Sequence, residues 1–110
     1  MSRVEMLRKF IVEKPGDPFP RYALALELKN GGSLAEAWAM FEALMIDRPD
    51  YVVAYLHAGN TLVALGRHAD AAATFRRGID ACARAGDSHA RGELEGALSL
   101  LPASPPSSST

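Results

Sequence analysis

The sequence repeats itself with a period of 34 residues. When the chain is shifted by 34 positions against itself, identical residues coincide at five places: Pro15 with Pro49, Leu28 with Leu62, Gly32 with Gly66, Ala37 with Ala71, and Phe41 with Phe75. A fixed period of about 20 to 50 residues is typical of stacked solenoids, in which each unit buries its apolar face against its neighbours. No stretch alternates with the period of two that strands require. The repeat therefore predicts an all-α stack.

Glycine, proline and capping residues divide this stack into six helices. Asp17, Asp50 and Asp87 are suitable N-caps, and Ser33 with Glu36 fits a capping box, in which each side chain binds the other residue's backbone N–H. Proline cannot continue a helix, and glycine commonly follows one. We expect helices over residues 2–14, 17–30, 33–48, 50–66, 68–85 and 87–101.

The repeated residues also carry a known pattern. Residues 18–51 and 52–85 supply two copies of it, with Leu24, Leu28, Ala37, Phe41 and Pro49 in the first, and Tyr55, Gly59, Leu62, Ala71 and Phe75 in the second. This pattern resembles the tetratricopeptide repeat motif, Trp-x2-Leu-Gly-x2-Tyr, then Ala-x3-Phe, then Pro. Two departures stand out, because Arg21 replaces the expected aromatic residue and Ala83 replaces the closing proline.

The resemblance implies a right-handed stack of antiparallel helix pairs, a tetratricopeptide-like α-solenoid of about six helices. Residues 1–101 would form one helical repeat domain, with full motifs at 18–51 and 52–85 and a half repeat at each end. Gly92 and Gly96 are expected to let the sixth helix lie tightly on the fifth. Residues 102–110 contain only Pro, Ala, Ser and Thr, a composition that predicts a disordered tail.

The composition narrows the classes of function. A formal net charge of -1 over 110 residues gives no field that would favour nucleic acid as a partner. No run approaches the roughly 18 apolar residues that span a bilayer, so no membrane partner is expected. The single cysteine, Cys82, excludes an internal disulfide and indicates a cytoplasmic protein. Nine Arg against three Lys, with abundant Ala, suit a bacterial source.

The sequence offers no arrangement of residues for catalysis or for a metal. His57, His68 and His89 lack the i, i+4 spacing that places two ligands on one helical face, so they are expected to be ordinary, partly exposed residues. Cys82 lies on an apolar stripe and is expected to be buried. We therefore expect no enzyme, no metal and no cofactor. The basic cluster of Arg76, Arg77 and Arg84 is expected to form a surface ion ladder with Asp80, not a nucleic-acid site.

One feature exceeds what folding requires. The second and fourth predicted helices each carry an additional apolar row, and the second row is interrupted by Asn60. The resemblance implies that such rows line a concave groove, with Lys29 and Arg91 adding polar contacts. The predicted groove residues are Phe19, Tyr22, Leu26, Lys29, Val53, Leu56, Asn60, Val63 and Arg91. A helix that is apolar nearly all round expects cover on both sides.

Two kinds of cover remain open at this point. Either the chain's own terminal segments fill the groove, or an apolar segment of another protein does. We expect the second: a protein-interaction module, an adaptor or scaffold that binds an apolar peptide or helix of a partner. The alternative is homo-oligomerisation, in which the groove or a solenoid end pairs with a second copy and a homodimer forms.

Overall fold

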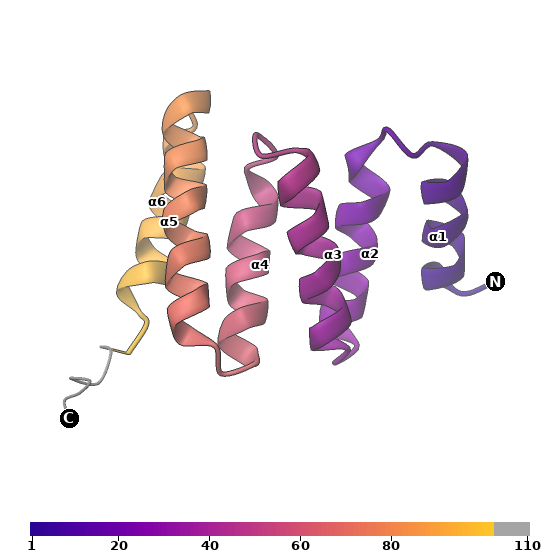
Figure 1. Cartoon of the computed structure of the whole chain (residues 1–110), viewed down its shortest axis with the longest axis horizontal. Helices are drawn as coiled ribbons and strands as arrows, with labels where there is room; N and C mark the ends of the chain where they lie inside the picture. The colour runs from indigo at the N-terminus through magenta and orange to yellow at the C-terminus, as the bar shows by residue number, and fades with distance from the viewer. Residues whose placement is uncertain (103–110) are drawn as a thin grey trace.

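The protein is a stack of six α-helices, seen side by side in Figure 1. This computed structural model describes residues 1–102, which contain no strand and measure 50 × 32 × 19 Å along the principal axes. The all-α prediction is confirmed, whereas the predicted disordered tail lies, apart from Pro102, outside the described residues. The helices are α1 (Arg3–Glu13), α2 (Pro18–Asn30), α3 (Leu34–Asp47), α4 (Val53–Ala64), α5 (His68–Ala85) and α6 (Ser88–Ser99).

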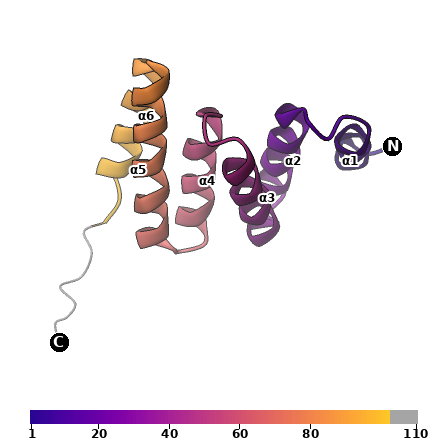
Figure 2. The same cartoon turned by 45° about the horizontal axis from the view of Figure 1, so that its top comes forward.

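The helices pack as successive neighbours along the stack, and α2, α4 and α6 also lie next to one another. The two described ends of the chain therefore lie at opposite ends of the stack (Figure 1). Figure 2 shows α1 nearly end-on while α5 is seen from the side, so the helix axes rotate along the stack. A rotation of this kind is what gives solenoids one curved binding face.

Local sequence sets most helix ends. The Asp17 side chain accepts a hydrogen bond from the Phe19 N–H, and Asp87 accepts one from Ala90. Gly32, Gly66 and Gly86 adopt positive φ values of 88°, 77° and 71° just after α2, α4 and α5, where a side chain would strain the backbone.

Two predicted caps are wrong. The Ser33 side chain makes no capping hydrogen bond, because the Glu36 carboxylate instead accepts one from Arg8 of α1 at 2.9 Å. Asp50 does not cap α4, which begins only at Val53, after a turn in which the Tyr55 hydroxyl donates to the Pro49 carbonyl at 2.7 Å. Both differences arise from contacts between parts of the chain that local sequence patterns do not reveal.

The core runs along the middle of the stack. Phe41 and Phe75, which occupy the same repeat position, are fully buried, and so are Leu24, Leu44 and Leu62. Close packing requires the glycine in α4, since a methyl group at Gly59 would overlap the ring of Phe75. Burying each of these large side chains stabilises the fold by about 1.5 to 3 kcal/mol.

The packing predicted for α6 is wrong. An added methyl group at Gly92 or Gly96 would meet nothing within 4 Å, so neither glycine brings α6 close to α5. The predicted ion ladder on α5 is also absent, since no ion pair joins Arg76, Asp80 and Arg84 in the described part of the chain. Arg77 instead lies over the Tyr55 ring, 5.9 Å from its centroid.

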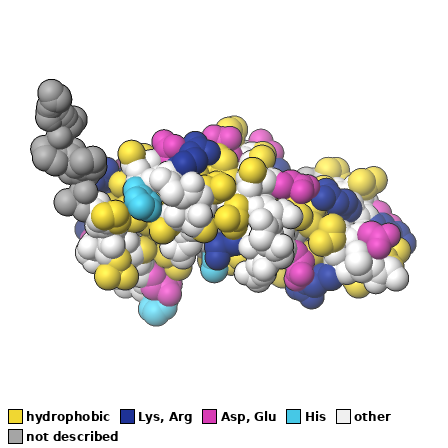
Figure 3. All heavy atoms as spheres, turned by 90° about the horizontal axis from the view of Figure 1, so that it is seen from below, with side chains coloured by type: hydrophobic (Ala, Val, Ile, Leu, Met, Phe, Trp, Pro, Cys, Tyr) yellow, Lys and Arg dark blue, Asp and Glu magenta, His cyan; other side chains and the backbone are white. Residues whose placement is uncertain are grey.

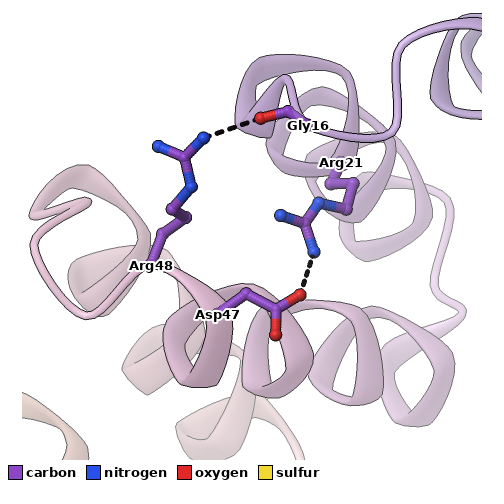
Figure 4. A network of polar contacts seen from close by, with 4 residues as sticks. All are labelled: Gly16, Arg21, Asp47 and Arg48. Atoms are coloured by element: carbon purple, nitrogen blue, oxygen red, sulfur yellow. Dashed lines mark hydrogen bonds and ion pairs between the residues drawn. The ribbon is translucent and has the colours of Figure 1, made fainter.

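Polar contacts fasten the first full repeat. Arg21, at the position where the motif expects an aromatic residue, pairs with Asp47 of α3 at 2.7 Å. The neighbouring Arg48 donates to the Gly16 carbonyl at 2.7 Å (Figure 4). These two contacts join the start of α2 to the end of α3, so arginine takes over a joining role at this position.

Candidate functional site

A groove runs between α4 and α6 and reaches α2. It consists of two hollows that share Leu56 of α4 and Glu93 of α6. The smaller hollow, of about 240 Å³, is lined by Tyr22, Val52, Val53, Leu56, His57, Ala90, Glu93 and Leu94. The larger hollow, of about 570 Å³, is lined by Leu56, Asn60, Val63, Phe75, Glu93, Gly96, Ala97, Leu100, Leu101 and Pro102. We call the two hollows together the α4–α6 groove.

The lining of the groove is mostly apolar, and part of it is open to solvent. Val53 is 45% exposed and Leu100 is 85% exposed, whereas Leu56 and Val63 are half-buried. A concave, mainly apolar surface with a few polar groups is the usual form of a binding site. On the face of the molecule seen from below, hydrophobic side chains lie interspersed with charged ones along the stack (Figure 3).

An aromatic cluster forms the α2 side of the groove. The Tyr22 ring lies 5.7 Å from that of Tyr51, 6.5 Å from Phe41 and 5.8 Å from the imidazole of His57, each in an edge-on arrangement. Such edge-to-face contacts are favourable because the positive edge of one ring meets the negative face of the other. Burial raises the pKa of Tyr22, and the nearby Tyr51 raises it further, so its hydroxyl stays protonated at neutral pH.

His57 is the titratable group of this cluster. Burial lowers its pKa, the positive charge of Lys29 lowers it further, and the Glu93 carboxylate raises it. The net direction is downward, which keeps the imidazole neutral at physiological pH. The groove therefore presents a neutral ring beside Tyr22.

Among the described residues that line the groove, Glu93 alone carries a full charge. Its carboxylate lies 3.7 Å from Nε2 of His89, a side chain that is 90% exposed and carries a charge only when protonated. No Lys or Arg of the described chain lies within ion-pair distance of Glu93. Asn60 is the other polar side chain of the larger hollow. The polar part of the groove is therefore small and negative.

The structure brings five of the nine predicted groove residues together. Tyr22, Val53, Leu56, Asn60 and Val63 all line the α4–α6 groove. These five come from the two apolar rows that the sequence indicates on α2 and α4.

The other four predicted residues lie elsewhere. Phe19 is 59% exposed and lines a separate hollow of about 460 Å³ between α1 and α2. Leu26 is half-buried against the core, and Lys29 is half-buried on α2, and neither lines one of the two hollows. Arg91 is exposed and pairs with Glu95 at 3.2 Å. The polar contacts expected from Lys29 and Arg91 thus have no counterpart in the lining.

Sequence reasoning missed most of the α6 side of the groove. The 34-residue register was the available signal, since it carries Leu56, Asn60 and Val63 of α4 onto Ala90, Leu94 and Ala97 of α6, all of which line the groove. Glu93 and His57 had no such signal, because the register places glycine, alanine or arginine at their equivalents. Their position follows from the packing of α6 on α4.

The described residues give no sign of catalytic chemistry. Residues 1–102 contain no group of three or more His, Cys, Asp and Glu side chains that could hold a metal ion. Cys82 is 1% exposed, and burial raises the pKa of its thiol, which makes it a poor nucleophile. No helix among these residues is both long and apolar enough to cross a membrane.

Solved structures of other proteins share this architecture. Two structures of a tetratricopeptide repeat domain protein from Salinibacter ruber, one in solution and one in a crystal, are each 39% identical to this chain. The solution structure matches with a TM-score of 0.72 over 76% of this chain and 85% of its own. The chain belongs to the tetratricopeptide repeat family. The crystal structure matches with a TM-score of 0.70 over 74% and 91% of the two chains.

A third solved structure shares the fold of this tetratricopeptide repeat protein. It is a protein from Bordetella parapertussis, 23% identical, with a TM-score of 0.78 over 90% of this chain and 86% of its own. No protein-family model and no curated protein sequence matches the chain. Membership of the tetratricopeptide repeat family supports a general role as a protein-interaction repeat module.

Proposed function

We propose that this tetratricopeptide repeat protein is a non-catalytic docking module that holds an apolar peptide or helix of a partner protein in the α4–α6 groove. The observation that carries the proposal is the pair of joined hollows, which leave Val53 and Leu100 exposed beside half-buried Leu56 and Val63. Each apolar side chain that a partner covers fully contributes about 1.5 to 3 kcal/mol. The single cysteine and the Arg-rich composition support an adaptor in the bacterial cytoplasm.

Selection of binders from a displayed library of random peptides tests this role. Peptides selected on the wild-type protein are expected to be rich in apolar residues. Their binding is then measured on Val53→Asp and Leu100→Asp, since both side chains line the groove and are exposed enough to be changed without loss of folding. We expect each variant to bind at least about tenfold more weakly, because a carboxylate replaces an apolar contact.

The matched control is Ile46→Asp. Ile46 is 69% exposed on α3 and lines neither hollow of the groove. Its variant should bind the peptides as the wild type does. Equal binding by all four proteins, each folded by circular dichroism, would show that the peptides do not bind in the groove and would overturn the proposal.

Exposed apolar residues at the ends of the stack favour a second role, self-association. Met6 and Phe10 of α1 are 42% and 43% exposed beside the 460 Å³ hollow, and Leu100 after α6 is 85% exposed. Pairing of such surfaces with a second copy would bury them. Sedimentation velocity at several concentrations tests this role: a rising sedimentation coefficient that Phe10→Asp abolishes supports it, and a single monomeric species throughout contradicts it.

A further inference from the structure

The charge of the α4–α6 groove indicates what kind of segment it accepts. Glu93 lines both hollows, and the other side chains that line them are neutral at physiological pH. Leu56, which also lines both, lies at the same junction. A segment that fills both hollows must therefore pass over a carboxylate that has an apolar surface on each side.

Covering this carboxylate has a cost unless the ligand pairs with it. The Glu93 side chain is 51% exposed in the free protein, so water solvates its charge. A bound apolar segment would remove part of that water, and an ionised group that loses water without gaining a partner is unfavourable. Its neighbour His89 is 90% exposed and neutral at pH 7 unless it takes up a proton, so it does not replace the lost solvation.

We propose that the partner segment carries two apolar anchors, one for each hollow, with a Lys or Arg between them that pairs with Glu93. Charge complementarity selects this occupant, because a cation gains the carboxylate as a partner and an acidic segment is repelled by it. The cation is also the reverse of what Lys29 and Arg91 would attract, and neither of these residues lines the groove. This inference rests on the docking role proposed above and states the chemistry of its ligand.

The spacing of the anchors follows from α6. Ala90 and Leu94 line the smaller hollow, and Ala97 and Leu101 line the larger one, seven positions further along in each case. Seven residues of helix rise about 10 Å. Anchors about 10 Å apart correspond to about two turns of a helix, or to positions three apart in an extended strand, with the cation midway.

The first test is the sequence content of the peptides selected on the wild-type protein. We expect Lys or Arg between two apolar residues to be enriched over the starting library. A cation-free or acidic consensus would overturn this inference while leaving the docking role in place. Failure to select any peptide would instead remove the docking role, and the inference with it.

The second test locates the cation. A synthetic peptide of the selected sequence is compared with the same peptide in which Gln replaces the central cation, on the wild type and on Glu93→Gln. We expect either change alone to weaken binding about three- to tenfold and the two together to weaken it little further, because both remove the same ion pair. Additive losses, or no loss, would place the cation elsewhere and overturn the inference.

Glu95→Gln is the matched control on the same helix. Glu95 is 52% exposed, like Glu93, but it pairs with Arg91 and lines neither hollow. Its variant should bind the peptide as the wild type does. A charge exchange completes the test: Glu93→Lys should bind the cationic peptide weakly and recover binding to a peptide with Glu at the central position. A loss with Glu95→Gln equal to that with Glu93→Gln would show a general charge effect and contradict the proposed pair.

Discussion

The two full repeats in the middle of the stack and the helices at its ends use the same repeat positions differently. Leu44 of α3 is fully buried, whereas Phe10 of α1, at the equivalent position 34 residues earlier, is 43% exposed. Phe41 is fully buried, and its equivalent Leu7 is still 8% exposed. A core position therefore becomes a surface position where no further helix of the described chain covers it.

The same change is seen at α6. Gly59 and Leu62 of α4 are buried against α5, but their equivalents on α6, Glu93 and Gly96, are exposed. Both of these α6 residues line the α4–α6 groove. The comparison teaches that the binding surface lies where the repeat pattern continues without the helix that would cover it.

The largest expected effect separates the middle from the end. Phe75→Ala should lower the free energy of unfolding by about 3 to 5 kcal/mol, because it leaves a cavity in the core of the two full repeats. Phe10→Ala on α1 should cost about 1 kcal/mol or less, since that ring is already 43% exposed. Urea unfolding of both variants measures the difference, and equal losses would remove the distinction between core and end.

A smaller effect is expected at Gly59. Gly59→Ala should destabilise the protein by about 1 to 3 kcal/mol, because the new methyl group overlaps the buried ring of Phe75 and the helices must move apart. Thermal unfolding followed by circular dichroism measures this loss. A gain in stability would contradict the close packing of α4 on α5.

The opposite sign is expected at the neighbouring register position on α6. Gly92→Ala should stabilise the protein by up to about 1 kcal/mol, because alanine favours helix and its methyl group meets nothing within 4 Å. The same thermal unfolding experiment provides the comparison with Gly59→Ala. Loss of stability would show that another part of the molecule lies against this face of α6.

The smallest expected effect is a dependence on pH. Burial lowers the pKa of His57 in the folded state, whereas the unfolded chain takes up its proton at about pH 6.5. Below that pH the unfolded state binds more protons, so this contribution to stability is complete above about pH 6.5 and is lost as the pH falls toward the folded pKa. Urea unfolding at a series of pH values should show a shallower decline for His57→Gln than for the wild type. Identical slopes would contradict the lowered pKa.

The sequence predicts the repeated part of the fold well, for a physical reason. Recurrence at 34 residues repeats every local choice, so Phe41 and Phe75 each indicate the burial of the other. Breakers such as Pro49 and Gly66 lie between the same elements in both copies. The all-α stack and the apolar rows of α2 and α4 follow from these local patterns.

Contacts between distant segments were beyond that reasoning. Ser33 loses its expected cap because Arg8, 28 residues before Glu36, takes the glutamate carboxylate. Gly92 suggested close packing of α6, but its open face depends on which helix follows, and the spacing of the residues carries no information on that. Arg91 was expected in the groove, yet it pairs with Glu95 on its own helix.

A titration followed by nuclear magnetic resonance tests the proposed docking surface most directly. Unlabelled peptide selected on the wild type is added to the isotope-labelled protein, and the change of each backbone amide signal is recorded. We predict that the largest changes fall on Leu56, Asn60, Val63, Glu93 and Ala97, which line the α4–α6 groove. Changes gathered around Ile46 on α3 or in the hollow between α1 and α2, with the groove unaffected, would contradict the account.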